Sequence, residues 1–123
     1  MKKNVILLAL VTLLVSCGSF SSLNSGTSIN ANEKFVLGSN PHGNFRTHLK
    51  NDGSTTLLVY QEPNDGGTHS PITLKPTEST FIKTDKNTAL VIENTETKMG
   101  YVTLKVTGDL NLGMAFQKNT KTK

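Results

Sequence analysis

The chain has 123 residues, a formal net charge of +4 at pH 7 and one cysteine, Cys17. This length fits a single domain, and one cysteine excludes an intrachain disulfide. The basic residues are scattered, apart from three lysines near the C-terminus, and the chain has no tryptophan. Because nucleic-acid-binding proteins carry a dense basic face interleaved with aromatic residues, we predict no nucleic-acid partner.

The N-terminus is typical of a secretory signal. Lys2 and Lys3 precede an apolar run over residues 5–15 that is broken only by Thr12. A charged start followed by a run of this length fits a signal peptide, whereas a membrane-spanning helix needs about 20 apolar residues. We therefore predict that residues 1–16 are removed on export, together with two of the positive charges.

The apolar run ends in Leu14-Val15-Ser16-Cys17, which resembles the lipobox of bacterial lipoproteins. The resemblance implies cleavage between Ser16 and Cys17, a covalent lipid on the Cys17 sulfur, and attachment to the bacterial cell envelope through that lipid. The residues after Cys17 are Gly and Ser rather than Asp, which favours the outer membrane. The alternative is an ordinary signal peptide that leaves Cys17 as a free thiol.

Residues 18–32 are rich in Ser, Asn, Gly and Thr and have little apolar content. Segments of this composition do not bury enough apolar surface to fold. We predict that residues 17–32 are a lipidated cysteine followed by a flexible tether. At full extension this tether would span roughly 50 Å and would hold the domain clear of the lipid headgroups.

Residues 33–117 contain short apolar bursts separated by Gly, Pro, Asn and Asp. The period of two is clearest in residues 45–50 and 101–107, and no window has helical apolar spacing. We predict an all-β domain of about eight short strands in an antiparallel two-sheet sandwich, either immunoglobulin-like or jelly-roll-like, with a basic tail over residues 118–123. The residues expected to face inward in the two clearest runs are Phe45, Thr47, Leu49, Val102, Leu104 and Val106.

Turn residues mark the connections between these strands. Asn51-Asp52-Gly53 predicts a tight hairpin, and residues 62–71 predict a longer loop. Pro71 and Pro76 bracket a short strand that we expect at a sheet edge, because proline cannot donate to a central ladder. Residues 74–79, LKPTES, resemble the Leu-x-Pro-Gly-x-Ser turn of many extracellular β-sandwiches.

We predict no metal site and no catalytic residue. The spacing of His42, His48 and His69 matches no compact zinc pattern, and the two Asn-Asp-Gly segments lack the acidic ligands of a calcium-binding EF-hand. We expect His42 in a solvent-facing loop, His48 on a strand face and His69 in a loop. The sequence has no G-x-S-x-G, H-E-x-x-H or P-loop motif, so we predict that the protein is not an enzyme.

Arg46, His48 and Lys50 alternate with apolar residues. We interpret them as the solvated face of an outer strand, and a basic stripe for anionic sugar or lipid is the alternative.

The leading functional hypothesis is an envelope interaction or assembly module that binds a partner protein, with β-augmentation at the Pro-bounded edge as one mode. The alternative is a glycan-binding or small-ligand-binding lipoprotein. In that case Tyr60 or Tyr101 would be a stacking platform, and Asn64, Asp65 and His69 would belong to the rim of the site.

Overall fold

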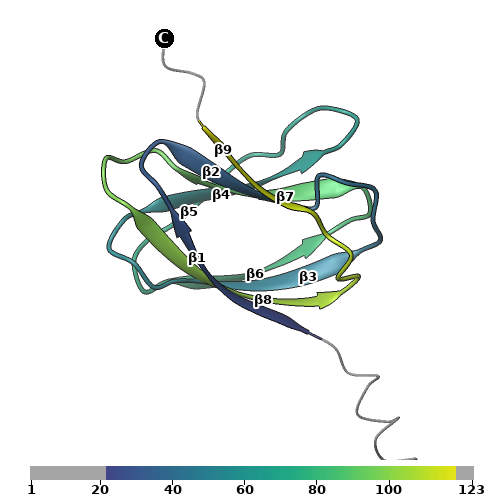
Figure 1. The fold of residues 1–123 in the computed structure, drawn as a ribbon, viewed down its shortest axis with the longest axis horizontal. Helices are drawn as coiled ribbons and strands as arrows, with labels where there is room; N and C mark the ends of the chain where they lie inside the picture. The colour runs from purple at the N-terminus through teal and green to yellow at the C-terminus, as the bar shows by residue number, and fades with distance from the viewer. Residues whose placement is uncertain (1–21, 119–123) are drawn as a thin grey trace, which may run out of the picture.

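The structure, a computed structural model, describes residues 22–118, which form nine strands and no helix (Figure 1). The predicted signal peptide, Cys17 and the residues after Lys118 lie outside the described residues. Within residues 22–118, no helix is long and apolar enough to cross a membrane. The strands are β1 (Leu23–Ile29), β2 (Glu33–Leu37), β3 (Phe45–Asn51), β4 (Leu57–Pro63), β5 (Ile72–Leu74), β6 (Ser79–Thr84), β7 (Thr88–Asn94), β8 (Gly100–Gly108) and β9 (Met114–Lys118).

The strands form two antiparallel sheets that face each other. One sheet has the order β1-β8-β3-β6, and the other has the order β5-β4-β7-β2-β9 (Figure 1). The chain crosses from one sheet to the other at every connection except β4–β5. The first eight strands have the order of a jelly roll, and β9 adds a fifth strand beside β2. The predicted all-β, antiparallel two-sheet sandwich is confirmed, and the jelly roll is the variant observed.

Side chains that alternate between buried and exposed positions along the strands form the core between the sheets. β3 alternates between buried and exposed residues over its whole length, and β8 does so from Gly100 to Val106. The six residues predicted to face inward are all buried, which confirms the period-two interpretation. The buried residues of the core are Ile29, Phe35, Leu37, Phe45, Leu49, Leu57, Val59, Leu74, Leu90, Ile92, Val102, Leu104 and Val106.

The predicted tether is wrong from Leu23 onward, because residues 23–29 form strand β1. All seven residues of β1 pair with β8, from Leu23 opposite Val106 to Ile29 opposite Gly100. The composition of this segment did not predict a strand, because β1 is held mainly by backbone pairing to β8 and contributes only two apolar side chains. The folded domain therefore includes residues 23–32, and it also includes Lys118, the first residue of the predicted tail, which belongs to β9.

Two predictions about β3 are also corrected. β3 is not an outer strand, because it lies between β8 and β6. Asn51-Asp52-Gly53 is not a tight hairpin, because β3 and β4 belong to different sheets. This segment is a connection between the sheets. Local turn chemistry indicates a change of direction here, but it does not indicate which strands pair.

Two asparagines, Asn51 and Asn94, end β3 and β7 and are fully buried. The Asn51 side chain donates to the carbonyl oxygens of Thr55 and Leu74, at 2.8 and 2.9 Å, and accepts from the Gly53 N–H. These amides satisfy backbone groups where the chain leaves a sheet, and an unpaired buried polar group costs about 1–3 kcal/mol.

Asn94 tests this role. Its amide nitrogen donates to the carbonyl oxygens of Ile29 and Lys98, at 3.0 and 2.7 Å. We expect Asn94→Asp to destabilise the fold by about 3 kcal/mol or more at pH 7, because a buried carboxylate would face these two acceptors. Urea unfolding is the measurement. The exposed Asn24→Asp on β1 is the control and should change stability by less than about 0.5 kcal/mol; similar values for the two variants would contradict the assignment.

The turn between β5 and β6 resembles the predicted Pro-Gly turn but has threonine at the glycine position. The Glu78 N–H donates to the Lys75 carbonyl oxygen at 3.0 Å, with Pro76 and Thr77 at the two central positions. Thr77 has a φ of 73°, a left-handed conformation that is unusual for a β-branched residue. A type II turn favours glycine at this position.

We expect Thr77→Gly to stabilise the domain by about 1 kcal/mol, because glycine removes the strain of a left-handed threonine. The unfolding temperature should rise by roughly 4–8 °C. Asn32 is a matched control, since it also has a positive φ of 58° but asparagine tolerates that conformation. An equal gain in Asn32→Gly and Thr77→Gly would refute strain at Thr77.

Candidate functional site

The first candidate surface is a groove between the edge strands β5 and β6. β5 has three residues and pairs only with Leu57–Val59 of β4, and β6 is the last strand of the other sheet. A hollow of about 270 Å³ therefore remains open between the sheets on this side. We call it the edge groove; its lining residues are Val59, Tyr60, Gln61, His69, Ser70, Ile72, Thr80, Phe81, Ile82 and Lys83.

The edge groove has an apolar lining and polar groups at its margin. Ile72 is 45% exposed and Phe81 is 64% exposed. The backbone N–H of His69 donates to the Gln61 carbonyl oxygen at 2.9 Å, and this bond keeps the β4–β5 loop beside β4. The expected edge position of the Pro-bounded strand is confirmed, since β5 ends its sheet. Unpaired strand edges beside exposed apolar side chains are a template for pairing with another chain.

Tyr60 is not a free stacking platform. It packs against Val36, Ala89 and Val91 on the outer face of the five-stranded sheet. Its hydroxyl donates to Glu93 Oε1 at 3.1 Å. Burial, followed by the negative charge of Glu93, raises the pKa of the Tyr60 hydroxyl well above its ordinary value. Tyr60 is therefore a neutral phenol at physiological pH, and its ring covers the sheet.

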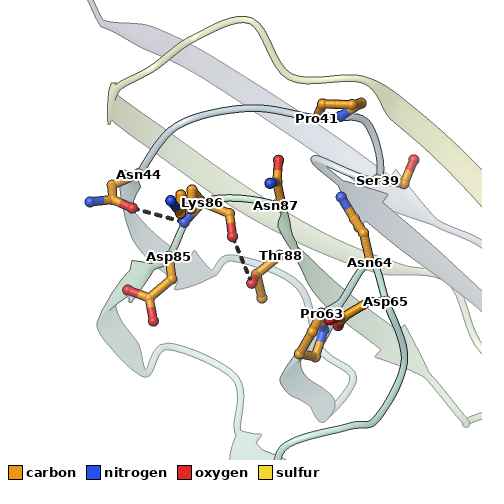
Figure 2. Close-up of a pocket in the computed structure, with 10 residues that line it drawn as sticks. All are labelled: Ser39, Pro41, Asn44, Pro63, Asn64, Asp65, Asp85, Lys86, Asn87 and Thr88. Carbon is orange, nitrogen blue, oxygen red and sulfur yellow. Dashed lines mark hydrogen bonds between the residues drawn. The ribbon is translucent and has the colours of Figure 1, made fainter.

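The second candidate surface is a polar cleft at one end of the sandwich (Figure 2). It has a volume of about 970 Å³, and we call it the loop cleft. The β2–β3, β4–β5 and β6–β7 connections form it, and the predicted residues Asn64 and Asp65 lie on one side, as Figure 2 shows. Its lining residues are Ser39, Pro41, Asn44, Pro63, Asn64, Asp65, Asp85, Lys86, Asn87 and Thr88, none of which is aromatic.

Hydrogen bonds to backbone groups of the connections fix the shape of the loop cleft. The Lys86 N–H donates to Asn44 Oδ1 at 2.8 Å, and the Thr88 hydroxyl donates to the Lys86 carbonyl oxygen at 3.2 Å (Figure 2). The Asn64 N–H donates to the Asn87 carbonyl oxygen at 2.9 Å and joins two of the connections. The cleft is thus preformed, which favours polar ligands that make several hydrogen bonds.

The prediction that His42 is solvent-facing is wrong. His42 is 8% exposed. Its Nε2 lies 3.0 Å from the Gly38 carbonyl oxygen and 2.9 Å from the Thr88 carbonyl oxygen, and its Nδ1 lies 2.6 Å from the Gly43 carbonyl oxygen. The imidazole joins the β2–β3 connection to the start of β7. Its role is structural, because all of these contacts are with backbone carbonyls.

Asp109, in the β8–β9 connection, binds the backbone of the β2–β3 connection. Its Oδ2 accepts from the Gly43 N–H at 2.6 Å, and its Oδ1 accepts from the Asn111 N–H at 2.9 Å. The Gly43 bond, then the Asn111 bond and then the nearby His42 hold the pKa of this carboxyl below its ordinary value. A carboxylate with a lowered pKa in the folded state stabilises the fold above its ordinary pKa, which is about 3.9.

We therefore expect Asp109→Asn to be less stable than the wild type at pH 7, with a difference that shrinks as the pH falls below about 3.9. The sign follows because protonation of Asp109 at low pH removes the same charge that the substitution removes. Urea unfolding between pH 7 and pH 2.5 measures this difference. Asp65→Asn is the control, since Asp65 accepts no hydrogen bond within the described residues; a difference for Asp109→Asn that is constant with pH would disprove the assignment.

The third candidate surface is the outer face of the four-stranded sheet, where Arg46 and His48 lie on β3 and Tyr101 lies on β8. All three are exposed, as expected for a solvated strand face. Tyr101 lies over Gly26 of β1, where an added Cβ would clash with the tyrosine hydroxyl. Its ring covers the neighbouring strand and does not project as a free platform.

The seven residues predicted as binding candidates thus lie on three surfaces and do not form one site. Tyr60 and His69 line the edge groove, Asn64 and Asp65 line the loop cleft, and Arg46, His48 and Tyr101 lie on the outer face of the four-stranded sheet.

The sequence analysis did not predict Ile72 and Phe81 as candidate binding residues at the groove. Their position depends on which strands pair, and the sequence pattern does not indicate that β5 and β6 are both edge strands on the same side. The sequence analysis also missed Lys83 and Lys105 beside β3. The period of two in β6 and β8 could have predicted that these two lysines point outward.

Within residues 22–118, no three His, Cys, Asp or Glu side chains come together as they would around a metal ion. The absence of a metal site and of an enzymatic activity stay predictions.

Comparison with known proteins identifies a fold. No family model and no curated protein matches the sequence. Over 68% of this chain and 93% of the other, the structure is similar to the crystal structure of PirA, with a TM-score of 0.54 and 13% identity. A cupin-superfamily sugar phosphate isomerase from Silicibacter pomeroyi matches with a TM-score of 0.49 and 10% identity, over 81% of this chain and 69% of the other. A mitogen derived from Yersinia pseudotuberculosis matches with a TM-score of 0.41 and 12% identity, over 72% and 86%. The similarity to PirA is one of fold alone.

Proposed function

We propose that this protein is a non-enzymatic, lipid-anchored jelly roll of the bacterial cell envelope, at the outer membrane, which binds an extended segment of a partner protein in the edge groove. The observation that carries the proposal is the exposure of Ile72 beside the edges of β5 and β6, which have no partner strand within residues 22–118. The Leu14–Cys17 lipobox supports the lipid anchor.

The groove offers both parts of peptide recognition by strand addition. The free edges of β5 and β6 supply backbone donors and acceptors, and these give affinity without depending on the partner's sequence. Ile72 and Ile82 supply apolar surface for alternate side chains of an added strand, which gives specificity. His69 and Lys83 place polar and cationic groups at the margin, where an acidic residue of the partner would pair.

A photo-crosslinking residue at position 72 tests this proposal in the detergent-solubilised native protein. We expect an adduct with one envelope protein, at a peptide that has alternating apolar residues. We expect Ile72→Glu to weaken the complex by at least about 10-fold, because burial of one isoleucine contributes about 1.5–3 kcal/mol.

Met99 is the matched control, because it is 58% exposed in the β7–β8 connection and does not line the groove. The same crosslinker at position 99 should give no such adduct, and Met99→Glu should bind normally. Adducts that are equal at both positions, or absent from both, would overturn the proposal.

The loop cleft supports a second candidate function, the binding of a glycan or another small polar ligand. Its lining combines amides, hydroxyls, two carboxylates and an ammonium group in a fixed arrangement. The absence of an aromatic side chain from this lining makes it the weaker candidate, since aromatic faces are common in glycan recognition. Saturable binding to a glycan array, together with no adduct at position 72, would reverse this order.

A further inference from the structure

Basic side chains from three adjacent strands gather on the outer face of the four-stranded sheet. Arg46, His48 and Lys50 project from β3, Lys83 from β6 and Lys105 from β8, and all five are exposed. The strand register makes Lys83 the neighbour of Arg46, and Lys105 the neighbour of His48. We call this set the basic face.

Acidic residues lie only at the margins of the basic face. Asp52 follows β3 and lies 3.7 Å from the ammonium group of Lys50. Asp85 and Asp109 follow the last residues of β6 and β8, at the other end of the sheet. The middle of the face therefore has a positive potential over the width of three strands.

The outer face of the five-stranded sheet carries no such excess of basic residues among the residues that the structure describes. Its ionisable groups include Glu93, which is paired in register with Lys34, and Glu62. The positive charge of the domain is thus concentrated on one of its two broad faces, which is the face that an anionic surface would attract more strongly.

The chain enters the fold at the edge of the same sheet that carries the basic face. Leu23 begins β1, which is the edge strand of the four-stranded sheet. Five residues, Gly18 to Ser22, separate Leu23 from Cys17, so the two Cα atoms are at most roughly 20 Å apart. Because neighbouring strands are about 4.8 Å apart, β8, β3 and β6 lie roughly 5–15 Å from β1. A lipid on Cys17 would therefore hold the sandwich at the membrane surface.

We infer that the basic face lies flat against anionic lipid headgroups and acts as a second membrane contact beside the lipid anchor. This inference rests on the proposed lipidation of Cys17. Each Lys or Arg close to an anionic bilayer adds its own electrostatic attraction to the surface. One lipid modification combined with a basic patch is a general means of stable membrane attachment. Phe81 is on the same face beside His48, with ring centroids 6.3 Å apart, and its exposed ring would face the headgroup region.

The position of a label tests this orientation in the lipidated protein. If Cys17 carries the lipid, a new cysteine is the only reactive thiol. Ser79 is exposed on the basic face, at the edge and end farthest from Leu23. Thr73 is exposed on the outer face of the opposite sheet. A fluorophore on each cysteine variant would be measured in phosphatidylglycerol–phosphatidylcholine vesicles that contain a headgroup-level quencher lipid.

We expect strong quenching at position 79 and little at position 73. Quenching at 79 should fall in pure phosphatidylcholine and at 0.5 M salt, because salt screens the attraction. The triple variant Arg46→Glu, Lys83→Glu and Lys105→Glu should lose the quenching at 79. The matched triple variant Lys34→Glu, Lys75→Glu and Lys98→Glu changes the net charge equally away from the basic face, and it should keep the quenching.

Equal quenching at positions 73 and 79, or none at 79, would overturn the inference. A sandwich that touches the membrane only through its loops near Leu23 would leave position 79 unquenched, which separates the two orientations. If the basic face binds a soluble anionic polysaccharide while 79 stays unquenched, the assignment to lipid is wrong. Intact mass distinguishes the premise from the inference, because a Cys17 that carries no lipid would refute the anchor itself.

Discussion

The structure depends on one apolar layer between two sheets. With no disulfide available, strands β1 to β8 must place side chains in that layer, and each fully buried Leu, Ile, Val or Phe contributes about 1.5–3 kcal/mol. This constraint also determines the outer faces. Because Phe45, Thr47 and Leu49 must point inward, the residues between them must point outward, and the positive charge of β3 is confined to one face. The basic face is therefore a consequence of how the core is built.

The connections between the sheets depend on buried polar side chains. A jelly roll crosses between its sheets repeatedly, and each crossing leaves backbone groups that no ladder satisfies. Asn51 and Asn94 satisfy such groups at one end of the sandwich, and His42 and Asp109 do so at the other end. The loop cleft owes its shape to the second pair, since both side chains bond to the backbone of the β2–β3 connection.

The sequence was sufficient to predict what depends on local pattern. The period of two in β3 and β8 predicted their inward faces, and the two prolines predicted the edge position of β5. The start of the domain was missed because β1 is held by pairing with β8, a contact about 75 residues away along the chain, which composition does not indicate. The β3–β4 connection was misread for a similar reason, since turn chemistry does not reveal that the partners of β3 are β6 and β8. His42 was misplaced because its burial places it between its own connection and the start of β7, which is more than 40 residues away along the chain.

The corrected start of the domain changes what the proposed lipid anchor would do. A tether that reached residue 32 would let the sandwich rotate freely, so neither broad face would be favoured at the membrane. If Cys17 carries the proposed lipid, the five residues between Cys17 and Leu23 would allow less rotation than a longer tether and would join the lipid to the sheet that carries the positive charge. In the proposed orientation, the five-stranded sheet faces away from the bilayer. The edge groove, on the side opposite β1, opens parallel to the membrane plane. An extended segment of another envelope protein that runs along the membrane surface would then meet the groove lengthwise, and the anchor would align the two chains before any contact between them forms.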